Sequence, residues 1–162
     1  KDFLDFARPK NPDLLPCRVE EVVEKNLAFV DGRAKEKKIA VETHFQQGLP
    51  EILADSDMLY QAFLNIIINS FQAMNDNGKM TIEIFHKQNN VVILFTDTGP
   101  GIKEENLEKI WTPFFTTKDS GTGLGLGVVK NIIDAHGGGI YMVNRESEGV
   151  RVEIVLPVKR DV

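Results

Sequence analysis

Cysteine and long apolar runs are both scarce in this chain. Cys17 is the only cysteine in 162 residues, which excludes an internal disulfide and a zinc site built on several cysteines. The longest apolar stretch surrounds residues 66–68, and Asn65 and Asn69 interrupt it well short of the roughly 20 apolar residues of a membrane span. No signal peptide is visible. We expect a cytoplasmic domain, whose parent protein is either cytoplasmic or membrane-bound.

Basic charge is scarce as well. The sequence has 19 lysines and arginines against 24 acids, a net charge of −5, and like charges form no continuous stripe. Proteins that bind nucleic acid present clustered basic side chains to the phosphates, so we expect no nucleic-acid partner. The length predicts a single domain with its own hydrophobic core.

The first 17 residues show a helical pattern followed by several prolines. The pattern of residues 1–8 is helical, and the prolines in residues 9–17 predict an extended connector after it. We expect the chain to be part of a longer protein.

The rest of the sequence alternates between helical and strand-like patterns. Helices are predicted over 19–38, 55–74 and 124–136, and strands over 39–45, 79–87, 91–97, 140–145 and 150–157, with a turn at Asn89-Asn90. The irregular region between Asp97 and Leu124 is long enough to be functional, with one short helix expected at 104–110. This order predicts an α+β fold, a two-layer α/β sandwich: a mixed, mostly antiparallel sheet of about five strands, covered on one face by three helices.

Alternating glycines precede the last predicted helix, in the run Asp119–Gly127. Glycines let the backbone approach an anion closely, and the start of a helix offers unpaired N–H groups. The run is therefore typical of a phosphate-binding loop, although a flexible turn explains these residues equally well on their own. Lys118 lies directly before the run, where it either neutralises a polyphosphate or stays solvated.

Two asparagines interrupt the apolar second helix, which we expect to be enclosed by other elements. Asn65 and Asn69 are four residues apart and share one face. A buried amide without a partner costs about 1–3 kcal/mol, so both need one. The partner is either a set of loop carbonyls, which the residues alone favour, or a hard cation such as Mg²⁺.

An aspartate follows a nearly continuous apolar strand, in Asp97-Thr98-Gly99-Pro100-Gly101. A carboxylate at the end of a buried strand can accept a hydrogen bond from the amino group of adenine and repels the carbonyl oxygen of guanine. Gly99 and Gly101 would let the loop pack against a base. Taken alone, the segment favours an ordinary aspartate-glycine turn, which is the commoner arrangement.

Four motifs follow one another in the sequence: Asn65–Asn69, Asp97–Gly101, Pro113–Phe115 and Gly121–Leu126. In this order they resemble the N box, first glycine box, F box and second glycine box of two-component sensor histidine kinases. The resemblance implies the Bergerat ATP-binding fold shared with gyrase B, Hsp90 and MutL. It divides the chain into the end of a dimerisation helix with its linker (1–18) and a catalytic domain (19–162).

The resemblance also implies a site for ATP and Mg²⁺. Asn69 would hold Mg²⁺, Asp97 would read adenine, and residues of about 102–122 would form a mobile lid. The catalytic residues would be Asn65, Asn69 and Lys118. The residues expected to bind the nucleotide are Asn69, Gln72, Ala73, Asp97, Gly99, Gly101, Ile102, Phe114, Thr117, Lys118, Gly121, Thr122, Gly123, Leu124, Gly125 and Leu126.

One position distinguishes transfer from hydrolysis. Hydrolysing relatives carry a glutamate one helical turn before the metal-binding asparagine, whereas this chain has Asn65, whose amide cannot take a proton. The resemblance therefore favours phosphoryl transfer to a histidine on a separate dimerisation domain. The chain departs from the family at three places. Gln72 replaces a common lysine or arginine, so more of the charge on the phosphates would be left to Lys118. Ser70 replaces the commoner alanine, and the segment Gly149–Val152 lacks a threonine that is often present.

The implied partners are the protein's own dimerisation domain and the receiver domain of a response regulator. The parent protein would be a homodimer and the isolated domain a monomer. None of the three histidines lies in the acidic-flanked motif of a phosphoacceptor: His44, His86 and His136. Three alternatives stay open, namely an ATPase of the same fold, a protein serine kinase of the same fold, and a nucleotide-binding module without turnover.

Overall fold

The computed structural model describes residues 11–102, 105, 125–145 and 149–158. The elements within these residues are β1 (Leu15–Cys17), α2 (Val19–Glu36), β2 (Ala40–Phe45), β3 (Ile52–Ala54), α3 (Ser56–Ala73), β4 (Lys79–Lys87), β5 (Asn90–Asp97), α4 (Gly125–Ala135), β6 (Gly139–Asn144) and β7 (Val150–Pro157). None of the helices in these ranges is long and apolar enough to cross a membrane.

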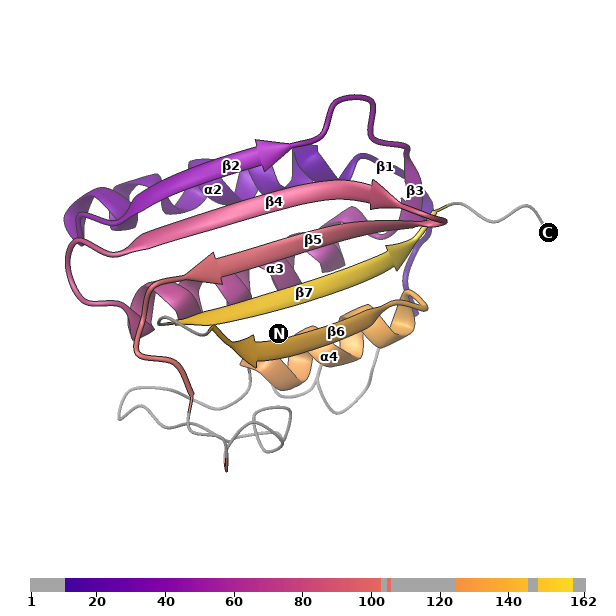
Figure 1. The fold of residues 1–162 in the computed structure, drawn as a ribbon. Coiled ribbons are helices and arrows are strands. Elements are labelled where there is room, and N and C mark those ends of the chain that lie inside the picture. Colours follow the sequence, from indigo (N-terminus) through magenta and orange to yellow (C-terminus); the bar gives the residue numbers. More distant parts are fainter. Residues whose placement is uncertain (1–10, 103–104, 106–124, 146–148, 159–162) are drawn as a thin grey trace.

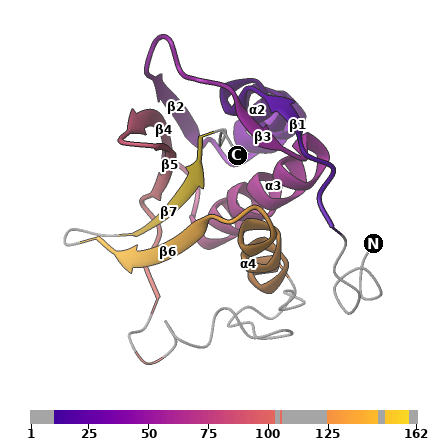
Figure 2. The same cartoon turned by 90° about the vertical axis from the view of Figure 1, so that its right-hand side faces the viewer.

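Five strands form one mixed sheet in the order β2-β4-β5-β7-β6. β2 pairs with β4 in parallel, and the other neighbouring strands are antiparallel. The three helices lie together on one face of this sheet, which gives the molecule two layers (Figure 1, Figure 2). The predicted α+β sandwich is confirmed.

The hydrophobic core lies between the helices and the sheet. β4 alternates in burial, and its Met80, Ile82 and Ile84 belong to the same apolar cluster as Phe63 of α3. The ring of Phe63 lies 5.6 Å from that of Phe95 on β5, measured between centroids. Because α3 is apolar almost all round, it can pack against α2, α4 and the sheet at once.

The small sheet of β1 and β3 differs from the expectation of a simple connector over residues 9–17. The three residues of β1 pair antiparallel with the three of β3. Strands this short show no alternation, so the sequence indicated only extended backbone. Cys17 is buried in this pair, and burial, followed by the charge of Glu20, raises the pKa of its thiol to about 11.

The connection between β4 and β5 lies one residue earlier than predicted. Asn90 already pairs with Lys87, and Gln88 has a φ of 56°, so Gln88 and Asn89 form the turn. The other predicted helices and strands agree with the structure to within two residues. The helix expected at 104–110 lies outside the described residues, apart from Glu105.

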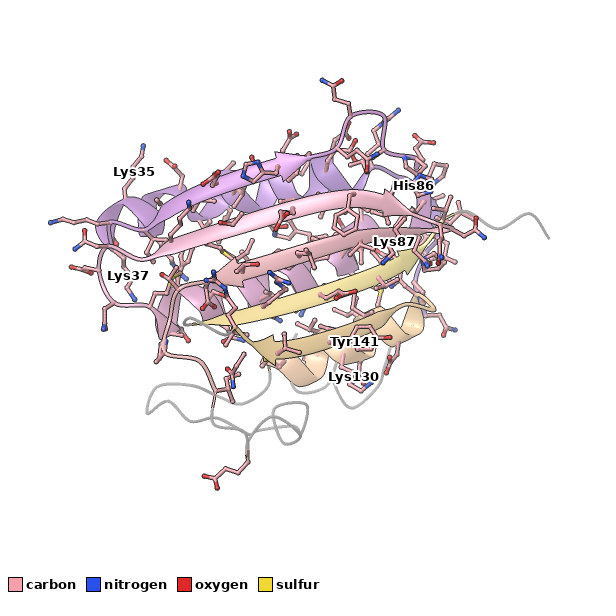
Figure 3. All side chains as sticks on the ribbon, viewed as in Figure 1. Lys35, Lys37, His86, Lys87, Lys130 and Tyr141 are labelled. Carbon is pink, nitrogen blue, oxygen red and sulfur yellow. The ribbon has the colours of Figure 1, made fainter. Side chains whose placement is uncertain are left out.

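A lysine from α2 closes the end of α3. Lys37 donates through Nζ to the carbonyl oxygens of Phe71 at 2.6 Å and Met74 at 2.9 Å. No basic residue lies in the last turn of α3 itself, so Lys37 supplies the cation that the carbonyl end of a helix favours. Lys37 and its neighbour Lys35 both extend from the same end of α2 (Figure 3).

Replacement of Lys37 by methionine should lower the free energy of unfolding by about 1–2 kcal/mol, because two charge-assisted hydrogen bonds are lost while the aliphatic stem remains. Urea denaturation of the purified chain measures this. Lys35→Met is the matched control, since among the described residues the Lys35 side chain pairs only with Asp31, and that pair is exposed. Equal effects of the two substitutions would contradict the capping role.

Candidate functional site

The structure describes ten of the predicted site residues. They are Asn65, Asn69, Gln72, Ala73, Asp97, Gly99, Gly101, Ile102, Gly125 and Leu126. The remaining seven lie outside the described residues: Phe114, Thr117, Lys118, Gly121, Thr122, Gly123 and Leu124.

Asp97 ends the central strand β5 with 5% of its surface exposed. Its Oδ1 accepts hydrogen bonds from the backbone N–H of Gly99 at 2.9 Å and of Val150 at 3.2 Å. Within the described part of the chain, Oδ2 accepts no hydrogen bond. The fold thus orients the carboxylate through one oxygen and leaves the other able to accept from a ligand.

Gly149 is the residue that lets β7 begin against Asp97. It has a φ of 95°, and a Cβ at this position would lie 2.0 Å from the carbonyl oxygen of Asp97. Only glycine fits such a contact. Arg145 donates to the same carbonyl oxygen at 3.1 Å. The sequence indicated a turn here, but not that the turn would hold Asp97.

The segment Gly149–Val152, which lacks the threonine, still donates to Asp97. The hydrogen bond to Asp97 comes from the backbone N–H of Val150, which any residue except proline supplies.

Asn65 and Asn69 lie on the side of α3 that meets the start of α4. A Cβ at Gly125 would lie 3.3 Å from Nδ2 of Asn69 and 4.0 Å from Cβ of Asn65. α3 is enclosed by other elements as expected, but both asparagines are only half-buried, because the face that carries them is at the edge of this packing. The two amides are therefore less buried than the enclosed apolar residues of the same helix.

Neither asparagine side chain makes a hydrogen bond to any residue that the structure describes. The interpretation in which they satisfy loop carbonyls thus finds no such carbonyl in the described ranges. Groups of three or more His, Cys, Asp and Glu side chains able to hold a metal are likewise absent from these ranges. A metal ion bound beside Asn65 and Asn69 would be coordinated by amide oxygens and by oxygens of the bound ligand.

The last turn of α3 meets the loop after β5. A Cβ at Gly99 would lie 3.4 Å from the carbonyl oxygen of Ala73 and 3.5 Å from its Cβ, so the loop lies directly against this turn. Gln72 is exposed beside it. α3 therefore joins two places, the start of α4 at Asn69 and the loop of Asp97 at Ala73.

Gly101 and Ile102 belong to the segment after β5, and residues 103–104 lie outside the described residues. Gly101 has a φ of 89°, which favours glycine, and Ile102 is partly buried against the hydrophobic core. Leu126 lies half-buried in the first turn of α4. In Figure 1 this loop, the C-terminal end of α3 and the start of α4 gather at the same end of the molecule.

The sequence resembles that of histidine kinases over nearly its whole length. Residues 54–160 match the family of histidine kinase-, DNA gyrase B-, and HSP90-like ATPases. Sensor histidine kinase ZraS of Escherichia coli O157:H7 is 37% identical over 157 residues, 97% of this chain and 34% of ZraS. Signal transduction histidine-protein kinase AtoS of Escherichia coli K12 is 33% identical over 159 residues, 98% of this chain and 26% of AtoS. The chain spans about a third of these relatives or less.

Solved structures share the fold. The nucleotide-free catalytic domain of histidine kinase ThkA gives a TM-score of 0.85 at 31% identity, covering 91% of this chain and 97% of that domain. Full-length ShkA in complex with AMPPNP gives 0.85 at 28% identity, covering 95% of this chain and 34% of ShkA. ThkA in complex with response regulator protein TrrA gives a TM-score of 0.83 at 28% identity, covering 95% of this chain and 44% of that ThkA chain.

The family match covers well over half of the chain and includes the second helix, the Asp97 loop and both strands of the β6–β7 hairpin. The ThkA domain matches almost end to end. The chain therefore belongs to the histidine kinase-, DNA gyrase B- and HSP90-like ATPase family, as a catalytic domain of the sensor histidine kinase type.

Proposed function

We propose that this chain binds ATP with Mg²⁺ and positions the γ-phosphoryl group for transfer to a histidine on a separate dimerisation domain. The observation that carries the proposal is the Asp97 carboxylate, whose Oδ1 is held by two N–H groups and whose Oδ2 has no partner among the described residues. The same helix that meets its loop, α3, carries the Asn65 and Asn69 carboxamides, which also have no partner among these residues. ShkA complexed with AMPPNP and ThkA complexed with TrrA support the nucleotide and the response regulator as partners.

Asp97 would select the base. Its Oδ2 accepts a hydrogen bond from the exocyclic amino group of adenine, whereas guanine presents a carbonyl oxygen at that position, which a carboxylate repels. Gly99 carries no side chain that could stand between this carboxylate and a ring, and its N–H fixes Oδ1.

Asn69 would hold the magnesium ion. Mg²⁺ keeps several waters and binds through few protein oxygens together with substrate phosphates. The residues present fit such an ion, because the Asn69 carboxamide has no partner among the described residues and faces Gly125, which has no side chain to fill the space. When bound, the ion would reduce the negative charge of the phosphates during transfer.

The phosphates would lie at the start of α4. Backbone N–H groups at the beginning of a helix attract anions, and Gly125 begins α4 beside Asn69. We assign Gly121, Gly123 and Lys118 to the same phosphates, and residues of about 102–122 to a lid over the nucleotide, on the sequence motifs that contain them.

The domain would act by orientation and charge. Asn65 cannot remove a proton from water, so this chain supplies no general base one turn before Asn69. An incoming imidazole needs none, since its ring nitrogen is itself the nucleophile. The chain's task is to hold the phosphoryl group in line with that nitrogen and to stabilise charge in the transition state.

The wider protein follows from the same proposal. Residues 1–18 would end a dimerisation helix and link it to the catalytic domain at 19–162. A homodimeric parent would then pass the phosphoryl group from its own histidine to the receiver domain of a response regulator.

Asn69→Ala should weaken ATP binding about tenfold in the presence of Mg²⁺ and much less in EDTA, because the lost group is a metal ligand. Calorimetric titration with AMPPNP measures both affinities. Asn75→Ala, an exposed change just past α3, should bind like the unaltered chain. A drop in thermal stability with unchanged magnesium dependence would assign Asn69 a structural role instead.

Asp97→Asn should reduce ATP affinity roughly tenfold or more and narrow the preference for ATP over GTP. The amide can keep its oxygen on the N–H groups of Gly99 and Val150, and then presents an NH₂ group to the amino group of adenine. Competition between the two nucleotides measures the preference, with the exposed Asp76→Asn as matched control. Unaltered discrimination would remove Asp97 from the base site.

Transfer itself is tested with labelled ATP. The chain alone should bind the nucleotide without becoming labelled, because none of its histidines lies in an acceptor motif. Addition of the dimerisation domain of its parent protein should give an acid-labile label on that domain. Strong self-labelling of the chain, or steady phosphate release without the second domain, would contradict histidine transfer.

A further inference from the structure

The β6–β7 hairpin contacts the segment after β5 at two places, residue 97 and residue 102. At residue 97, Val150 and Arg145 donate to the carboxylate and carbonyl oxygen of Asp97. At residue 102, Asn144, the last residue of β6, reaches Ile102. Figure 1 shows this segment passing the start of β7 and the end of β6. The hairpin thus contacts this segment at residues 97 and 102, while Thr98 and Gly99 between them meet β4 and the end of α3.

The contact at residue 102 uses both halves of one carboxamide. Oδ1 of Asn144 accepts from the backbone N–H of Ile102 at 2.8 Å, and Nδ2 donates to the carbonyl oxygen of Ile102 at 2.6 Å. A carboxamide combines a donor and an acceptor as a peptide does, so it satisfies both backbone groups of one residue. Aspartate at this position would keep the acceptor and place a negative oxygen against the Ile102 carbonyl.

Gly101 adds an independent constraint to this contact. Its φ of 89° turns the chain toward Asn144, and a Cβ at Gly101 would lie 2.9 Å from Oδ1 of Asn144. Glycine is therefore required both for the backbone conformation and for the close approach. The sequence around residues 101 and 144 is thus arranged to bring the Ile102 peptide to the Asn144 carboxamide.

Asn144 lies at the surface, away from the hydrophobic core. Its side chain is exposed, and it ends β6, an edge strand of the sheet. The hydrogen bonds at such a place contribute little to global stability, since water can replace them once the strand end frays. Their effect is local, on a segment that also carries the nucleotide-selecting carboxylate.

We propose that Asn144 is a positioning residue of the nucleotide site, which holds Gly101 and Ile102 in the binding conformation of the Asp97 loop without contacting the nucleotide. The inference rests on the proposed ATP binding. A segment held at residues 97 and 102 before the ligand arrives loses less conformational entropy on binding, so the clamp raises affinity.

The test compares Asn144→Asp with Asn89→Asp. The second variant makes the same chemical change in the exposed turn at the opposite end of β5. We expect Asn144→Asp to raise the dissociation constant for AMPPNP five- to twentyfold, with a melting temperature close to that of Asn89→Asp. Asn89→Asp should bind like the unaltered chain.

Amide hydrogen exchange measured by NMR provides a readout that a general loss of stability would not reproduce. In the nucleotide-free chain the Ile102 N–H should be protected, and in Asn144→Asp this protection should fall while amides of β4 and β5 keep theirs. Asn144→Ala, which removes the carboxamide without adding charge, should behave the same way.

Three results would overturn the positioning role. These are an unchanged dissociation constant in both Asn144 variants, an unprotected Ile102 amide in the unaltered chain, and unfolding of both variants while Asn89→Asp stays folded. Failure of the unaltered chain to bind AMPPNP would instead contradict the proposed function, and Ile102 protection would still show whether the clamp exists.

Discussion

The site depends on one carboxylate that the fold holds through a single oxygen. Asp97 lies at the end of the central strand, where burial would penalise its charge if no donor were present. Two backbone N–H groups, from its own loop and from the start of β7, meet Oδ1. They stabilise the anion and fix its direction together, because backbone donors cannot rotate away as side chains can.

Glycine provides the close approaches that this arrangement requires. At Gly149 a side chain would collide with the backbone of Asp97, and at Gly125 it would fill the space before Asn69. α3 connects the Asp97 loop to the start of α4. Asn69 faces α4, and Ala73, about one turn later, faces the Asp97 loop. The base end and the phosphate end of the proposed site therefore share one rigid helix, which fixes their separation.

The fold could be predicted because its elements are long and strongly patterned. α3 is apolar almost all round, and Asp55 caps its start by accepting a hydrogen bond from the backbone N–H of Met58. The β1–β3 pair was missed because three residues show no period. The predicted turn after β4 was one residue too late, because Gln88 adopts a positive φ, which glutamine in a sequence does not indicate.

The site was predicted unevenly for a related reason. Asp97 and Asn69 carry local motifs, whereas Val150 reaches Asp97 across 53 residues and Asn144 reaches Ile102 across 42. Such contacts follow from the strand register and from the path of the β6–β7 hairpin. No local pattern in a single sequence indicates either of them. The half-burial of Asn65 and Asn69 likewise depends on where α4 begins. All the binding and catalytic roles assigned from the motifs, those of Asp97 and Asn69 included, stay predictions.

The most direct test is a crystal structure of this chain with AMPPNP and Mg²⁺. The account predicts the exocyclic amino group of adenine within hydrogen-bond distance of Oδ2 of Asp97, while Oδ1 still accepts from Gly99 and Val150. A nucleotide bound elsewhere, or an adenine whose amino group finds another acceptor while Asp97 stays unliganded, would contradict it.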